Sequence, residues 1–109
     1  MRGVKPEGPH IYSDKVYGTK AGVIEVGSER WYAWLAEEEG REFVFRSAAG
    51  NWHHARREWR GKSAYWYVAC RVSGRVRRFY LGPAAALDVE RLAAVGAAIA
   101  AAREGAAEG

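Results

Sequence analysis

The chain has 109 residues, enough for one domain with little left for a second. With 49% apolar and 28% charged residues, it is neither a disordered acidic chain nor a collagen-like one, so we expect it to fold. Basic residues outnumber acidic ones by 17 to 13, and most are arginine, which binds phosphates and guanine edges bidentately, so the composition indicates a nucleic-acid partner.

The N-terminal quarter is predicted to be irregular and then helical. Residues 1–22 contain scattered glycine and proline without helical or strand periodicity, so we expect a flexible arm. Residues 23–26 suit either a short strand or an apolar lead-in. Ser28 is a candidate N-cap, and large apolar side chains at helical spacing over residues 31–38 predict a short helix.

The centre of the chain changes to the periodicity of strands. Residues 42–46 and 51–59, separated by a turn, predict a hairpin. Residues 65–72 and 75–81 predict a second hairpin, because the Ser-Gly pair between them is typical of a tight two-residue turn.

A helix is predicted after Asp88, a candidate N-cap, as far as about Ala102. The expected fold is α+β, a three- to four-stranded antiparallel meander sheet with this C-terminal helix packed on one face and the short N-terminal helix nearby. We assign one domain to residues 23–103, with residues 1–22 as the arm and residues 104–109 as a frayed tail. One long helix cannot cover both faces of the sheet, so one face is expected to stay open.

The positive charge is concentrated in the predicted sheet. Residues 46–78 contain nine lysines and arginines and one glutamate, a net charge of +8, whereas residues 25–42 carry a net charge of −4. Solubility alone does not require such a concentration within one supersecondary unit. The basic centre therefore indicates a binding surface.

Strand alternation identifies the side chains of the open face. Along residues 65–72 the even positions are uniformly apolar and suit the helix-covered side. Along residues 75–81 the odd positions Phe79 and Leu81 suit that side, and Arg77 shares their register but lies near the turn, where it can reach solvent. The even positions are left for the open face. For residues 51–59 two registers remain open, and either adds an arginine. The candidate nucleic-acid-binding residues are Arg56, Arg57, Arg60, Lys62, Tyr65, Tyr67, Arg71, Arg75, Arg77, Arg78 and Tyr80.

A three-stranded sheet with arginines and aromatics on its outer face can enter the major groove of duplex DNA. We therefore predict a non-enzymatic protein that binds double-stranded DNA. The principal contacts would be Arg56, Arg57, Arg71, Arg75 and Arg78, and Arg60, Lys62 and Arg77 would hold phosphates at the turns. Single-stranded DNA or RNA, bound by stacking on the tyrosines, and a protein partner are the alternatives. One sheet face is small for specific binding by a monomer, so either a homodimer or a tandem binding site is expected.

Five segments resemble a known family, namely Trp31–Leu35, Ala55–Glu58, Tyr65–Ala69, Gly74–Gly82 and Leu87–Leu92. They are similar to a small module at the N-termini of large bacterial LuxR/MalT-like regulators. The strands that end in Tyr-Leu-Gly before a helix more distantly resemble the arm-binding domains of tyrosine recombinases and the plant ethylene-response DNA-binding domains. The second, more distant resemblance implies a three-stranded sheet in the major groove, and the two together imply a role in transcription regulation or recombination.

Other functions find little support in the sequence. His53, His54 and Cys70 do not make up the four ligands of a zinc site, and no nucleophile–base pair stands out, so we expect no metal, no cofactor and no enzymatic activity. The longest apolar region, residues 84–102, is mostly alanine and includes charges, which is unfavourable for a membrane span. Without a signal-peptide pattern, a cytoplasmic location is expected.

Overall fold

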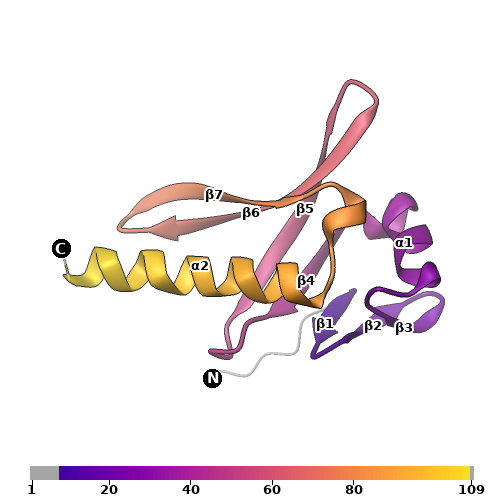
Figure 1. Ribbon diagram of the computed structural model, residues 1–109, viewed down its shortest axis with the longest axis horizontal. Helices are drawn as coiled ribbons and strands as arrows, with labels where there is room; N and C mark the ends of the chain where they lie inside the picture. Colours follow the sequence, from indigo (N-terminus) through magenta and orange to yellow (C-terminus); the bar gives the residue numbers. More distant parts are fainter. Residues whose placement is uncertain (1–7, 109) are drawn as a thin grey trace.

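The computed structural model describes residues 8–108, with side chains as far as residue 105, and these residues form a seven-stranded mixed sheet with two α-helices (Figure 1). The strands are β1 His10–Tyr12, β2 Lys15–Thr19, β3 Gly22–Glu25, β4 Glu42–Arg46, β5 Trp52–Arg60, β6 Ser63–Val72 and β7 Arg75–Gly82. The helices are α1 Glu29–Ala36 and α2 Val89–Glu108, with short 3₁₀ turns at Glu38–Arg41 and Ala84–Ala86.

Four strands, β4 to β7, lie where the sequence predicts them and pair in antiparallel order. The turn between β6 and β7 uses Ser73 and Gly74 in the left-handed region, with φ of 55° and 78°. These values suit a type I′ turn, whose twist matches that of the flanking strands. The long alternating strands are therefore determined by local sequence.

The predicted three- to four-stranded meander is wrong, because the sheet has seven strands in the order β3-β2-β1-β4-β5-β6-β7. The three additional strands come from residues 10–25, most of which were assigned to an arm without strands. Strand β1 pairs in parallel with β4, opposite Phe45 and Val44, which makes the sheet mixed. Ile11 and Val16 are fully buried, so their burial against the rest of the core stabilises these short strands. Residues 1–7 of the predicted arm lie outside the described residues.

Helix α1 packs its apolar side into the core. The hydroxyl of Ser28 accepts a hydrogen bond from the Trp31 amide at 3.2 Å, which caps the helix as predicted. The indole N–H of Trp31 donates to the Leu87 carbonyl at 2.8 Å, so the helix is tied to the segment before α2. Trp31 and Trp34 are both fully buried, and their rings stack 5.8 Å apart.

The 3₁₀ turn after α1 makes a close backbone contact at Gly40. A Cβ atom at this position would overlap the Trp34 carbonyl oxygen and lie 2.8 Å from the Leu35 Cα, so only glycine fits. The Gly40 carbonyl in turn accepts a hydrogen bond from the indole of Trp66 at 3.1 Å. This contact fixes α1 against the middle of β6.

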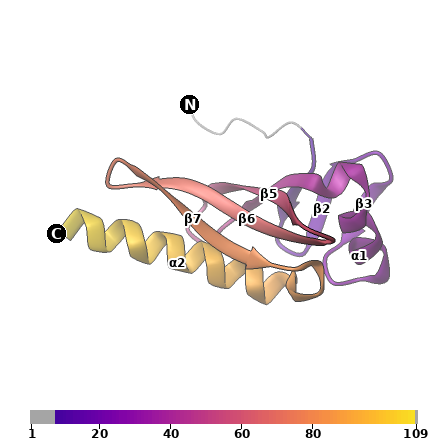
Figure 2. The ribbon, with the colours of Figure 1, turned by 90° about the horizontal axis from the view of Figure 1, so that it is seen from above.

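Helix α2 lies along the sheet beside β6 and β7 (Figure 2). Asp88 caps its first turn by accepting the Arg91 amide at 2.8 Å, and Leu92, Val95 and Ile99 form the buried stripe. The helix continues to Glu108, beyond its predicted end near Ala102, since its alanine-rich sequence has high helix propensity. Both helices pack into one continuous core, so no helix of the described residues covers the opposite face of the sheet.

Candidate nucleic-acid interface

The helix-free side of the sheet, called the open face below, presents a continuous series of aromatic and basic side chains. The pairing register places Arg56 opposite Tyr67 and Tyr67 opposite Tyr80 on this side. Its aromatic and basic members are His10, Tyr12, Lys15, Tyr17, Arg46, Trp52, His54, Arg56, Arg60, Tyr65, Tyr67, Arg71, Arg78 and Tyr80. Seven of the eleven sequence-predicted binding residues therefore share one surface.

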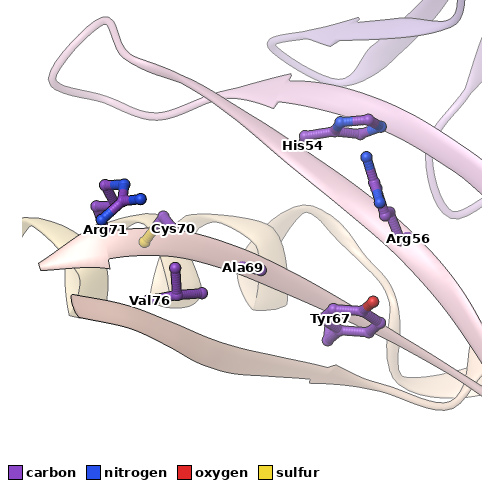
Figure 3. A pocket seen from close by; sticks show the side chains of 7 residues that line it. All are labelled: His54, Arg56, Tyr67, Ala69, Cys70, Arg71 and Val76. Carbon is purple, nitrogen blue, oxygen red and sulfur yellow. The ribbon is translucent and has the colours of Figure 1, made fainter.

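A hollow of about 390 Å³, called the basic hollow below, opens where β5 and β6 separate beyond the pair Ala55 and Val68 (Figure 3). It is lined by His54, Arg56, Tyr67, Ala69, Cys70, Arg71 and Val76. In the described part of the chain, no carboxylate lies within 4 Å of the Arg56 or Arg71 guanidinium. Both cations are therefore available to an anionic ligand.

Arg78 contacts the ring of Tyr67 beside this hollow. The Arg78 guanidinium lies 3.8 Å from the centre of the Tyr67 ring and bonds to the Glu58 carboxylate at 2.6 Å. Tyr65 and Tyr80 lie next to this group, with ring centres 5.8 Å apart. A second hollow, of about 200 Å³, is lined by Glu58, Arg60, Tyr65, Tyr67, Arg78 and Tyr80. Stacking surfaces and cations thus alternate over β5 to β7.

A second aromatic group on the open face was not predicted from the sequence. The His10 ring lies 5.8 Å from that of Tyr17 and 6.1 Å from that of Trp52, which brings together β1, β2 and β5. The Arg46 guanidinium lies 5.3 Å from the Tyr12 ring centre in the same region. The signal was present as alternation in the segments His-Ile-Tyr and Lys-Val-Tyr, each with its central residue buried.

Arg57 is not a surface residue, although it was predicted to be a principal contact. Its side chain is only 7% exposed and donates to the carbonyl oxygens of Leu35 at 3.0 Å and Glu37 at 3.1 Å. Its guanidinium also lies 5.9 Å from the Trp66 ring centre on the helix-covered side. Arg57 therefore joins β5 to the end of α1.

Arg75 and Arg77 also lie on the helix-covered side of β7, opposite Val72 and Cys70. Both are exposed, since β7 is an edge strand, but they do not share a surface with Arg78. Lys62 is exposed in the turn between β5 and β6. These three residues remain near the basic centre without belonging to the open face.

The side chains of His53 and His54 point to opposite faces of β5. His53 lies on the core side, where it is 5% exposed and its ring centre lies 5.4 Å from that of Phe45. Burial lowers the pKa of its imidazole below the usual 6.5, and the positive charge of Arg103 lowers it further. Among the described residues, no three His, Cys, Asp or Glu side chains gather as metal ligands would. His53 is thus a neutral core residue at neutral pH.

Neither described helix combines the length and hydropathy required to cross a membrane. Comparisons with protein-family models, with curated proteins and with solved structures gave no match for this chain. The geometry of the open face is therefore the basis for a functional proposal.

Proposed function

We propose that the open face binds single-stranded nucleic acid, with bases stacked on the exposed aromatic rings and phosphates held by the arginines between them. The observation that carries the proposal is the arrangement of two aromatic groups on one helix-free face, separated by the basic hollow. Stacking on aromatic side chains accepts any base, and cations between the rings follow the backbone. The predicted cytoplasmic location agrees with such a ligand.

The width of the sheet favours a single strand over a duplex. Neighbouring strands lie about 4.8 Å apart, so the two aromatic groups, which extend from β2 to β7, span about 24 Å, whereas the major groove is about 12 Å wide. The adjacent strands also rotate by about 20–25° each, which twists the open face by more than 100° from β3 to β7. A flexible single strand can follow this twist, but a stiff duplex cannot without a cost in bending energy.

The charge of the open face supports the same ligand. Arg56 and Arg71 have no carboxylate partner among the described residues, whereas Arg78 is paired with Glu58 and His54 bonds to Glu42 at 2.9 Å. A few free cations between stacking rings suit a ligand that is bound through its bases as well as its phosphates. A purely electrostatic duplex contact would need more free charge.

Fluorescence anisotropy with labelled 12-nucleotide poly-dT and poly-U and a 12-base-pair duplex tests the proposal. We expect the single strands to bind more tightly than the duplex, with a log–log salt slope of about −2 to −3 for three to four neutralised phosphates. Tyr80→Ala should weaken binding about 5- to 150-fold, the effect of losing one stacked base.

Trp59→Ala is the matched control, because Trp59 is 60% exposed but lies on the helix-covered side at the end of β5. It should leave the affinity unchanged. Tighter binding of the duplex, with no effect of Tyr80→Ala, would support groove binding instead. No binding of any nucleic acid at 50 mM salt would reject the proposal and leave a protein partner for this face.

A further inference from the structure

The basic hollow combines a stacking ring and a free guanidinium on directly opposite residues. Arg56 of β5 and Tyr67 of β6 are register partners on the open face, and both line the hollow. Side chains of directly opposed residues begin about 5 Å apart at Cβ. Arg56 extends toward His54 on its side of the hollow (Figure 3), so an edge of a planar group stacked on Tyr67 and reaching across the hollow would meet the Arg56 guanidinium.

The faces of the Tyr67 ring are not equivalent. Arg78 comes from β7, and its guanidinium lies over the ring at 3.8 Å. This contact, reinforced by the bond from Arg78 to Glu58, occupies one face and fixes the orientation of the ring. The other face is left for a ligand that enters the basic hollow.

The described side chains that line the hollow supply hydrogen-bond donors, and none of them is a carboxylate or a carboxamide. Arg56 and Arg71 can only donate, and His54 is engaged with Glu42 at 2.9 Å. One Arg71 N–H already bonds to the Gly74 carbonyl at 3.0 Å, which holds Arg71 at the outer end of the hollow. A ligand that offers two acceptors on one edge beside Arg56, and negative charge near Arg71, complements these donors.

We propose that the basic hollow is a guanine subsite for the single strand, an inference that rests on the proposed function. The guanine stacks on the free face of Tyr67, Arg56 donates two hydrogen bonds to its O6 and N7 atoms, and Arg71 contacts the adjacent phosphate. Guanine is the base whose O6 and N7 edge offers two neighbouring acceptors, and bidentate arginine is its commonest partner. Adenine places a donor amino group beside N7, which would face the donors of Arg56.

The experiment compares 12-nucleotide poly-dT with the same strand carrying one central guanine, adenine or 7-deazaguanine. The wild-type protein should prefer the guanine strand to the adenine strand by about 5- to 150-fold, the discrimination of one bidentate pair. The 7-deazaguanine strand, which lacks the N7 acceptor, should lose part of that preference.

Arg56→Lys distinguishes bidentate recognition of guanine from simple attraction by positive charge. Lysine keeps the positive charge but lacks the planar guanidinium that donates two parallel hydrogen bonds. It should lose the guanine preference, so that any remaining affinity is the same for the guanine and adenine strands. Arg60→Lys is the matched control, since Arg60 lies on the same face but lines the other hollow, and it should keep the preference.

Equal binding of all four strands by the wild-type protein, or a full guanine preference in Arg56→Lys, would overturn the guanine subsite and leave the stacking face intact. Failure of poly-dT and of every substituted strand to bind would reject the proposed function together with its subsite.

Discussion

Adjacent arginines on β5 have opposite roles, and this difference gives the sharpest test of the structure. Arg56 points to the open face and has no carboxylate partner among the described residues, whereas Arg57 is 7% exposed and bonded to two carbonyl oxygens. We expect Arg57→Ala to destabilise the fold and Arg56→Ala to leave its stability unchanged. Arg56→Ala should weaken nucleic-acid binding, whereas Arg57→Ala should leave the binding of the folded protein unchanged.

The magnitude for Arg57 follows from the groups that its removal leaves behind. Each hydrogen bond from a charged donor contributes about 1.5–3 kcal/mol, and the carbonyls of Leu35 and Glu37 would both lose a partner. The lost contact with Trp66 adds to this. The Glu37 carbonyl lies at the surface, where water can replace the lost bond, so we expect the free energy of unfolding to fall by about 2–4 kcal/mol, and the Tm to fall by at least 8 °C or so.

Urea unfolding followed by tryptophan fluorescence, with thermal unfolding by circular dichroism, measures both variants against the wild-type protein. Arg56→Ala should stay within about 0.5 kcal/mol of the wild-type value, as expected for an exposed surface residue. A loss below about 1 kcal/mol for Arg57→Ala would refute the assignment of Arg57 as the link between β5 and α1.

Two further predictions concern the core. Gly40→Ala should destabilise the protein by about 1–3 kcal/mol in urea unfolding, because its Cβ would overlap the Trp34 carbonyl, whereas Gly105→Ala, with open space around it, should not. The folded-state pKa of His53 is lowered, so the unfolded chain binds more protons below about pH 6.5 and stability should fall as pH falls from 7.5 to 5.5. His53→Leu should reduce this pH dependence, and an unchanged dependence would show that another group causes it.

The sequence predicts the long strands well and the short ones poorly. Strands β6 and β7 alternate over several residues and are joined by a turn with its own signature, so local sequence is sufficient. Strand β1 has three residues, and its position depends on parallel pairing with β4, more than thirty residues away along the chain. Such pairing has no local signal, and an antiparallel meander was expected instead.

The candidate site shows the same division between local and distant information. The two registers of residues 51–59 are equally mixed in polarity, because the core side contains His53 and Arg57. Burying an arginine on that side is costly unless its guanidinium is hydrogen-bonded. The partners are carbonyl groups at the end of α1, which only the folded structure places beside Arg57. Alternation alone therefore placed Arg57 among the binding residues.

The arginine content of the basic centre overstates the charge that is available for binding. Arg57 is committed to the fold and Arg78 to Glu58, while Arg75 and Arg77 lie on the other side of β7. The open face keeps only a few free cations but presents two groups of aromatic rings. Binding there must depend more on stacking than on phosphate neutralisation, so a shallow salt dependence together with a large effect of Tyr80→Ala is the combination that this surface predicts.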